Sequence, residues 1–405
     1  MKKGWQTKKL GDVCEIKPPK SEARERVAAD ALVSFAPMED LGIGRKFLNA
    51  SQVKPLADVV GSYTYFADGD VLLAKITPCF ENGKLGIAAD LNNGIGFGSS
   101  EFIVFRPSVS LDKEFLYYFL ARPEFRTEGA ARMGGAVGQQ RVPKEFIESY
   151  RIPVPPLPEQ QRIVGILDEA FEGIAIAKAN AEKNLQNAHA LFESYLQSVF
   201  TQRGPGGAEK RLGEVAESIS TGPFGTMLHK SDYVPDGIPL VNPMNIVDSR
   251  IVPSSKMMVN EKTRDRLRSY VLKAGDVVIG RRGELGRCAL VTEREEGWLC
   301  GTGSFFVRLS DCMDAKFFVA LFGSQQFRSR LEGSAVGTTM SSLNHGILNN
   351  LRLPVPPIAV QKEEIAKADE LRSETQRLES IYQQKLAALE ALKKSLLQQA
   401  FRGQL

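Results

Sequence analysis

Two kinds of hydrophobic pattern alternate along the chain. Residues 1–156 and 205–357 contain short runs of β-branched and aromatic side chains that glycine and proline interrupt. Runs of this kind predict strands joined by turns. Residues 157–204 and 358–405 instead repeat apolar side chains at spacings of three and four, with no proline after Pro158 in the first and none in the second. That periodicity predicts two long helices.

The apolar stripe of each predicted helix is narrow, which favours a coiled coil between the two. A helix of some 43 residues would be about 65 Å long. The alternative, an amphipathic helix that lies on its own domain, calls for a wider stripe and leaves the matched length of the two helices unexplained. We assign these residues to the seam: Leu167, Ile174, Ala181, Leu191, Tyr195, Leu371, Leu378, Tyr382, Leu389 and Leu396.

The whole pattern occurs twice, at an offset of roughly 200 residues. Three pairs of segments show this most clearly: 9–13 with 211–215, 68–72 with 274–278, and 151–156 with 352–357. A single repeat of this length indicates a duplication, and two copies in one molecule are expected to be related by a pseudo-twofold axis. Under that symmetry the two helices run antiparallel.

The sequence therefore predicts an α+β protein with two sheet-rich domains and two long antiparallel coiled-coil helices. We place the domains at 1–156 and 205–357 and the helical regions at 157–204 and 358–405. The repeat also sets a register for the seam. It pairs Leu167 with Leu396, Ile174 with Leu389, Leu191 with Leu371, Tyr195 with Ala368, and Ala181 with Tyr382.

Composition narrows the function classes only a little. The net charge of +4 is too small to indicate nucleic acid by itself, and 43% hydrophobic residues are typical of a globular chain. No apolar run approaches the roughly 18 residues that a membrane span needs. Five cysteines without a paired motif suit a reducing compartment, so we expect a cytoplasmic protein without a membrane partner.

A search for catalytic patterns finds none that fits. The three histidines (His189, His229 and His345) stand alone, so no zinc-site spacing is present. Residues 280–286 are rich in glycine and arginine but lack the lysine and hydroxyl of a phosphate-binding loop. Residues 242–245 depart from the Asn-Pro-Pro-aromatic loop of amino-methyltransferases. We expect no catalytic residue, metal ligand or cofactor in this chain.

Several motifs together resemble the specificity subunit of type I restriction–modification systems. They are the repeated Pro-Val-Pro-Pro hinge, the Leu-Pro-Glu-Gln-Gln start of the first helix at Leu157, and the Phe-Arg-Gly ending at Phe401. One departure is that the second helix opens without the glutamate present at Glu159. The resemblance implies a DNA-binding target-recognition subunit that reads a bipartite site. It also implies partner methyltransferase subunits and restriction subunits, which supply S-adenosylmethionine chemistry and the ATP- and Mg-dependent steps.

Candidate DNA contacts are basic, amide and hydroxyl side chains in loops, because these groups bind phosphates and base edges. In the first domain the candidates are Lys75, Thr77, Lys84, Arg132, Gln139, Gln140 and Arg141. In the second they are Thr226, Lys230, Asn242, Asn245, Arg281, Arg282, Arg287, Thr338, Thr339 and Ser341.

Three other functions remain open at this point. The chain could be a bipartite DNA-binding adaptor of another system, an enzyme whose site follows no familiar pattern, or a coiled-coil scaffold without sequence preference. Labelled S-adenosylmethionine tests the second alternative, and DNA-binding preference tests the third. The target sequence and the spacer length do not follow from one sequence.

Overall fold

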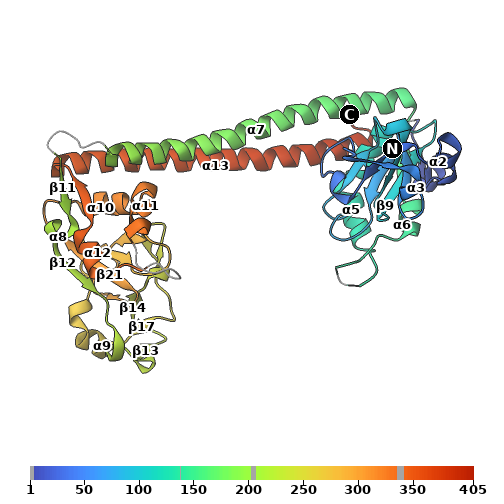
Figure 1. Ribbon diagram of the computed structural model, residues 1–405. Helices are drawn as coiled ribbons and strands as arrows, with labels where there is room; N and C mark the ends of the chain where they lie inside the picture. Colours follow the sequence, from blue (N-terminus) through green and yellow to red (C-terminus); the bar gives the residue numbers. More distant parts are fainter. Residues whose placement is uncertain (1–3, 137, 202–206, 335–341) are drawn as a thin grey trace. The chain divides into compact units, whose positions relative to one another are not determined.

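Figure 1 shows the computed structural model of the chain, which describes residues 4–136, 138–201, 207–334 and 342–405. The chain forms two compact units. Unit 1 comprises Met1–Ala181 and Gln384–Leu405, and unit 2 comprises Glu182–Gln383. The two long helices, α7 (Leu157–Thr201) and α13 (Ile358–Arg402), each contribute residues to both units.

Unit 1 contains two four-stranded sheets. The first has the strand order β2-β9-β6-β7 and is antiparallel throughout, whereas the second has the order β4-β3-β8-β5 with β3 and β8 parallel. A separate pair, β1 and β10, closes the domain. The strands are β1 (Gln6–Lys9), β2 (Cys14–Ile16), β3 (Leu32–Ala36), β4 (Gln52–Pro55), β5 (Thr64–Ala67), β6 (Val71–Ala74), β7 (Leu85–Ile87), β8 (Ile95–Gly98), β9 (Phe102–Pro107) and β10 (Arg151–Val154). The short helices are α1 (Leu10–Val13), α2 (Ser21–Arg26), α3 (Leu56–Val59), α4 (Lys113–Leu120), α5 (Pro123–Ala130) and α6 (Lys144–Ser149), with 3-10 turns η1 (Met38–Asp40) and η2 (Asn92–Gly94).

Unit 2 repeats this plan in its antiparallel sheet and its closing strand pair, but its second sheet differs at the edges: β20 is an edge strand, whereas its counterpart β8 pairs with β5. Its antiparallel sheet has the order β12-β21-β18-β19, its second sheet has the order β13-β17-β14-β20, and β11 pairs with β22. The strands are β11 (Ala208–Arg211), β12 (Ala216–Thr221), β13 (Tyr233–Val234), β14 (Ile238–Val241), β15 (Ile246–Val247), β16 (Arg250–Ile251), β17 (Met258–Val259), β18 (Val277–Gly280), β19 (Cys288–Leu290), β20 (Leu299–Cys300), β21 (Ser304–Leu309) and β22 (Arg352–Val355). The helices are α8 (Leu212–Val215), α9 (Glu261–Arg266), α10 (Ala315–Gly323), α11 (Gln325–Ser334) and α12 (His345–Asn350), with turns η3 (Gly225–Met227), η4 (Lys230–Asp232), η5 (Pro243–Asn245) and η6 (Arg268–Tyr270).

A buried aspartate explains one of the repeated motifs. Asp70 is 1% exposed, receives two hydrogen bonds from the guanidinium of Arg106, both at 2.9 Å, and accepts the main-chain N–H of Ala67. Asp276, also 1% exposed, receives the same pair of bonds from Arg308. A buried carboxylate is tolerated only with such partners. The repeated Gly-Asp of the sequence therefore marks this ion pair in both sheets.

A buried glutamine joins each sheet domain to its long helix. Gln160, at the start of α7, accepts the N–H of Asp112 at 2.8 Å and donates to the carbonyls of Ser110 and Pro155 at 2.9 and 2.7 Å. Gln361 of α13 makes the equivalent bonds to the N–H of Asp314 and to two carbonyls. Both glutamines are fully buried. The glutamate missing from the second helix is not needed for this junction, because Glu159 instead forms a surface ion pair with Arg162.

The long helices pack antiparallel within each unit. In unit 1 the end of α13 joins the core that contains the start of α7, and Phe401 packs edge-on against Phe115 with ring centroids 4.9 Å apart. In unit 2 the roles are exchanged: the end of α7 joins the core beside the start of α13, and Phe200 packs against Phe317 at 5.5 Å. The prediction of two long antiparallel helices is thus confirmed.

Most of the predicted seam residues are at least half-buried. Leu167, Ile174 and Ala181 are 0%, 8% and 1% exposed, respectively. The half-buried members are Tyr195, Leu371, Leu378, Tyr382, Leu389 and Leu396. Leu167 and Leu396 belong to one core of unit 1, and Tyr195 and Ala368 to one core of unit 2, as the predicted antiparallel sense requires.

The prediction is wrong at Leu191, which is 58% exposed. The neighbouring Phe192 lies inside the seam, where the guanidinium of Arg372 sits 5.2 Å from its ring centroid. Likewise Leu185, rather than Asn184, is half-buried on α7. Along α7, the buried or half-buried positions follow one another at spacings of four and then three residues, as in Ala181, Leu185, Ala188 and Phe192. The prediction assumed a spacing of three and then four, and it therefore placed every second seam position one residue too early. None of the described helices is both long and apolar enough to cross a membrane.

Candidate nucleic-acid interface

In unit 1, the loop that follows β6 meets the segment that precedes α6. The N–H of Thr77 bonds to the carbonyl of Gln140, and the N–H of Val142 bonds to the carbonyl of Lys75, at 2.9 and 3.0 Å. Ile76 forms an isolated β-bridge with Arg141. These main-chain bonds bring together Lys75, Thr77, Gln140 and Arg141, four of the candidates from distant parts of the sequence.

A carboxylate holds the two cations of this cluster. Glu101 receives hydrogen bonds from Nε and Nη2 of Arg141 at 3.0 and 2.8 Å, and it lies 3.9 Å from the ammonium of Lys75. The bonds from Arg141, followed by the charge of Lys75, hold the pKa of Glu101 below its ordinary value. The pairs lie at the surface, since the side chain of Arg141 is 44% exposed. Arg141 is therefore oriented yet reachable by a phosphate or a base edge, whereas the Lys75 ammonium also donates to the carbonyl of Ser100 at 2.9 Å.

The remaining candidates of unit 1 divide by exposure. Gln139 is exposed in a narrow hairpin that Gly134 and Arg141 close with two main-chain hydrogen bonds. Arg132 is exposed and stacks over the ring of Phe146, 5.0 Å from its centroid. Lys84 instead donates its ammonium to the carbonyl of Met38 at 2.8 Å, which makes it part of the fold.

Unit 2 builds the same junction from different side chains. Arg281 follows β18, its N–H bonds to the carbonyl of Gly303, and its carbonyl accepts the N–H of Leu343 at 3.0 Å. Arg282 forms an isolated bridge with Ser342. The Arg281 guanidinium turns back to the carbonyl of Leu343 at 3.3 Å, whereas Arg282 is exposed. The chain path is thus shared with unit 1, while the side chains that it presents are different.

A second organising carboxylate lies in this loop. Glu284 binds Arg287 at 2.8 Å through one oxygen and Arg328 at 2.8 Å through the other. The hydrogen bond from Arg287 is the main cause that lowers the pKa of Glu284. The arrangement parallels that of Glu101 in unit 1. Glu101 and Glu284 were not predicted from the sequence, because a carboxylate does not itself bind phosphates. The sequence feature that marks both is a glutamate beside a glycine-rich loop.

Two asparagine candidates have structural roles. Asn245 is 3% exposed; its amide donates to the carbonyl of Val252, and its oxygen accepts the N–H of Asn242. Asn242 in turn accepts the N–H of Gly303 at 3.3 Å. These bonds fix the turn η5 against the sheet. The prediction of a DNA contact is therefore wrong for Asn245, because a buried side chain with satisfied bonds cannot reach a base edge.

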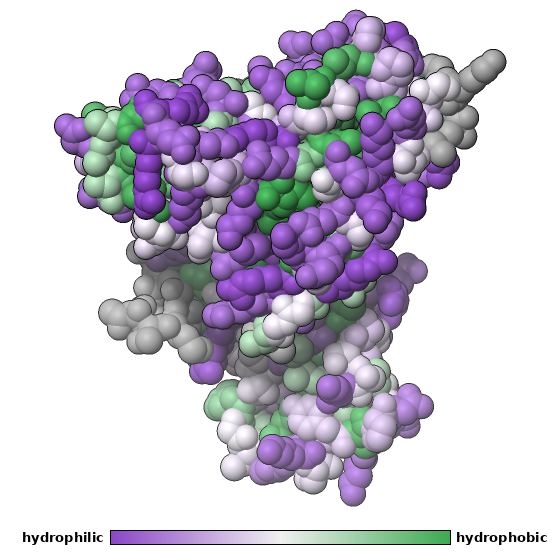
Figure 2. All heavy atoms as spheres, turned by 90° about the vertical axis from the view of Figure 1, so that its right-hand side faces the viewer, coloured by the Kyte–Doolittle hydropathy of each residue, from purple (hydrophilic) through white to green (hydrophobic). Residues whose placement is uncertain are grey.

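The other candidates of unit 2 lie apart. Thr226 and Lys230 are exposed in turns η3 and η4, which Arg266 fixes through the carbonyl of Met227 and an ion pair with Asp232 at 3.0 Å. Three candidates, Thr338, Thr339 and Ser341, lie outside the described residues. On the face shown in Figure 2, hydrophilic residues predominate and hydrophobic ones appear between them in smaller groups. In the described parts of the chain, no group of three or more His, Cys, Asp or Glu side chains could hold a metal ion.

The family model for the type I restriction modification DNA specificity domain matches this chain twice, at residues 2–187 and 207–390. The chain belongs to this family. The two matches fall on the two copies of the internal repeat, so the duplication seen in the sequence is a duplication of the specificity domain.

Named relatives of this specificity-domain chain include subunits of bacterial and archaeal enzymes. The Escherichia coli type I restriction enzyme EcoEI specificity subunit is 39% identical over 222 residues, which is 49% of this chain and 37% of the relative. The EcoAI specificity subunit, also from Escherichia coli, is 39% identical over 162 residues, 40% of this chain and 27% of the relative. The matched part thus spans about a third of these two relatives. The MjaVIII specificity subunit of Methanocaldococcus jannaschii is 23% identical, over 73% of this chain and 71% of its own.

Two solved structures have the same fold along the entire specificity-domain chain. The HsdS subunit from Thermoanaerobacter tengcongensis superposes with a TM-score of 0.70, at 20% identity, over 100% of this chain and 98% of that chain. A chain from a structure that describes complex assembly and conformational transition of the type I R-M system gives a TM-score of 0.77, also at 20% identity, over 100% and 99%.

Proposed function

We propose that the chain is the DNA sequence-specificity subunit of a type I restriction–modification complex. Each sheet domain reads one half of a bipartite target in double-stranded DNA. The long helices set the spacer between the halves and dock methyltransferase subunits. Restriction subunits complete the assembly.

The observation that supports this most strongly is the repeated junction of the two units. Both units join the loop after the central strand to the segment before a short helix by matching main-chain bonds, yet the exposed arginine lies on the segment before the helix in one case, Arg141, and on the loop after the strand in the other, Arg282. One scaffold with two side-chain sets suits two readers of different sequence, because base edges are distinguished by side-chain donors and acceptors. A scaffold without sequence preference has no need for such variation.

We propose further that the chain itself is not catalytic. S-adenosylmethionine, ATP and Mg would bind the partner subunits, and this chain would supply only the recognition of the DNA sequence. Family membership and the specificity-subunit names of its relatives support this division.

A methylation assay tests both proposals. The purified chain is incubated with a duplex library and labelled S-adenosylmethionine, first alone and then with the methyltransferase subunit from its own system. We expect no label from the chain alone and methylation at one split sequence from the pair. Label transferred by the chain alone would overturn the non-catalytic role. Methylation without sequence preference in the pair would overturn the specificity role.

A further inference from the structure

In unit 1 an ionic latch ties the sheet domain to helix α7. We use the word latch for four residues: Lys46, Glu114, Tyr118 and Asp168. The Lys46 ammonium binds Asp168 of α7 at 2.7 Å and also pairs with Glu114 of α4. The Tyr118 hydroxyl donates to Asp168, and the Lys46 ammonium lies 5.2 Å from the centre of the Tyr118 ring. The latch thus consists of one base, two acids and a phenol.

The internal repeat shows what occupies the same positions in unit 2. The helix caps Asp112 and Asp314, and the buried glutamines Gln160 and Gln361, anchor the correspondence. Counted from these anchors, Glu114 becomes Lys316, Tyr118 becomes Ala320 and Asp168 becomes Asp369. Arg250 takes the place of Lys46. The loop that carries Lys46 runs beside β7 in unit 1, and the β15–β16 hairpin that carries Arg250 packs in the same way against β19, the counterpart of β7, in unit 2. One acid has become a base, and the phenol has become a methyl group.

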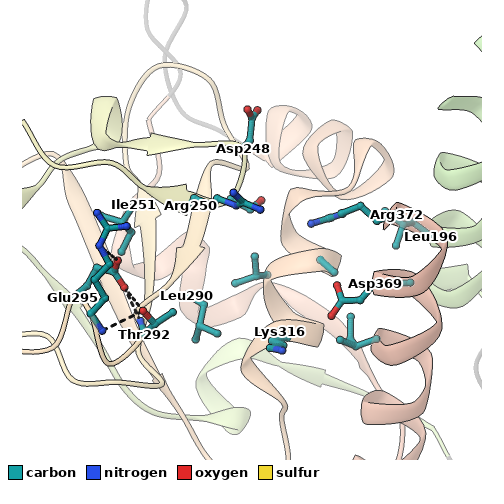
Figure 3. Close-up of a pocket in the computed structure, with 16 residues that line it drawn as sticks. Leu196, Asp248, Arg250, Ile251, Leu290, Thr292, Glu295, Lys316, Asp369 and Arg372 are labelled. Carbon is teal, nitrogen blue, oxygen red and sulfur yellow. Dashed lines mark hydrogen bonds and ion pairs between the residues drawn. The ribbon is translucent and has the colours of Figure 1, made fainter. Parts of the chain in front are cut away.

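A pocket of about 430 Å³ lies at this place in unit 2 (Figure 3). Arg250 and Arg372 extend toward each other from opposite walls, and neither has an ion-pair partner among the described residues. Asp248 at the rim directs its carboxylate away from the pocket. On the far wall, the carboxylate of Glu295 accepts hydrogen bonds from the main-chain N–H and the hydroxyl of Thr292.

The pocket continues into a groove. A second cavity of about 740 Å³ shares Arg250, Ala320 and Arg372 with it and extends along α13 to Thr375 and Glu379. Apolar side chains form part of the walls, including Leu196, Ile251 and Val319, which are 5%, 5% and 9% exposed. An elongated groove with apolar walls and facing cations suits an extended segment better than an isolated ion.

We propose that this groove binds a segment of a partner protein that carries an aromatic side chain beside a carboxylate. The aromatic ring would fill the space that Tyr118 fills in unit 1, and a hydroxyl on it could donate to Asp369. The carboxylate would lie between Arg250 and Arg372 and near Lys316, where the latch of unit 1 has Glu114. The occupant supplies the two groups that the second copy has lost. This proposal is independent of how the chain reads DNA.

The test uses the full chain and three fluorescein-labelled synthetic peptides, followed by fluorescence anisotropy. The first has a tyrosine flanked by two glutamates on each side. The second replaces these glutamates with lysines, and the third replaces the tyrosine with alanine. We expect the first peptide to bind at least about tenfold more tightly than either of the others, because it alone provides both the ring and the negative charge.

Variants locate the binding. Ala320→Tyr with Lys316→Glu copies the latch of unit 1 and should weaken binding of the first peptide about tenfold or more. Arg250→Glu, on an exposed hairpin, should do the same without any change in the core, and Lys362→Glu, an exposed residue of α13 outside the groove, is the matched control. Conversely, Tyr118→Ala with Glu114→Lys should open a second site in unit 1 and raise the stoichiometry to two peptides per chain.

Equal affinity for the three peptides, or full binding by the folded Arg250→Glu variant, would overturn the proposal. Displacement of the first peptide by inorganic phosphate and by free tyrosine to the same extent would point instead to a small-molecule site. Sedimentation that shows a dimer of this chain, lost in the Ala320→Tyr variant, would identify a second copy as the occupant and overturn the proposal as well.

Discussion

At the scale of single residues, a buried glutamine joins each sheet domain to its long helix. Gln160 and Gln361 each satisfy one N–H and two carbonyls at the point where a sheet domain meets a long helix. A planar amide can do this because it offers both an acceptor and two donors. Glutamate lacks the donors, and lysine lacks the acceptor.

We predict that Gln160→Leu destabilises unit 1 by roughly 2–4 kcal/mol, because it leaves buried main-chain groups without partners. Thermal or urea unfolding of the full chain measures the loss. Gln161→Leu is the control, since Gln161 is the same residue type at the next position and is exposed. Equal effects of the two substitutions would show that the junction does not depend on this amide.

The Glu101 cluster makes stability depend on pH. Pairing with Arg141 lowers the pKa of Glu101 in the folded protein, so the stabilisation is complete above the ordinary carboxyl pKa of about 4.3 and disappears as the pH falls through the lower folded value. We predict that the difference in melting temperature between the native chain and Glu101→Gln is constant from pH 7 to about pH 5 and shrinks below that. Glu145→Gln, which removes a carboxylate at an exposed position of α6 outside this cluster, is the control. A Glu101→Gln difference that grew toward low pH would contradict the pairing.

At the scale of elements, α7 and α13 form a seam in which small and large residues alternate. Ala181 is 1% exposed, Asn184 is exposed, and the stripe continues with half-buried Leu185 and buried Ala188. The anchors of the stripe recur every seven residues, which is the repeat of a coiled coil. The seam is therefore most sensitive to added volume at the alanines.

We predict that Ala181→Arg costs roughly 2–4 kcal/mol, from excess volume and an unpaired charge in the seam. Asn180→Arg, one residue away on the exposed face, should cost less than about 0.5 kcal/mol. Chemical unfolding of both variants, monitored by circular dichroism at the helix band, provides the comparison. The observed register also predicts that Phe192→Ala lowers the free energy of unfolding more than Leu191→Ala does. The reverse order would show that Leu191, as predicted from the sequence, lies in the seam.

At the scale of the whole molecule, two copies of one scaffold present different loops. The strand order of the antiparallel sheet, the buried Asp–Arg pair and the glutamine junction are shared by both units, whereas the side chains at the loop junctions are not. The residues that determine the fold are thus separate from those that vary between the loop junctions. Under the proposed function, this separation would allow one domain to change its target without a change of fold.

We predict that replacing residues 1–156 by the corresponding domain of another family member changes one half of the recognised sequence and leaves the other half and the spacer intact. Sequencing of the sites methylated by the hybrid with its methyltransferase partner reads this directly. A simultaneous change of both halves would mean that the two units do not recognise DNA independently.

The helices provide a second test at this scale. Insertion of seven residues at matched points of α7 and α13 preserves the heptad repeat and lengthens each helix by about 10 Å. At ~3.4 Å per base pair, we predict about three additional base pairs of spacer between unchanged half-sites. Insertion of seven residues into α7 alone should instead disrupt the packing of α7 against α13. An unchanged spacer in the matched insertion would exclude the helices as the ruler.

The sequence by itself determined the duplication, the sheet and helix classes and the antiparallel sense of the long helices. Each of these follows from a periodicity of apolar residues or from a repeat, and both can be read from the order of residues alone. Leu191 and Phe192 mark the limit of such reasoning: both are apolar, and only the packing of α7 against α13 decides which one enters the seam.

Tertiary structure alone decided which candidate side chains are available. Asn245 and Arg141 are both polar loop residues, yet the first is buried by bonds to Val252 and Asn242, while the second is held at the surface by Glu101. The partners lie between 3 and 40 positions away in the chain. The groove of unit 2 was equally hidden, because Ala320 is an ordinary helix residue until the other copy shows Tyr118 in its place. Availability depends on neighbours that folding brings together, and no local pattern encodes them.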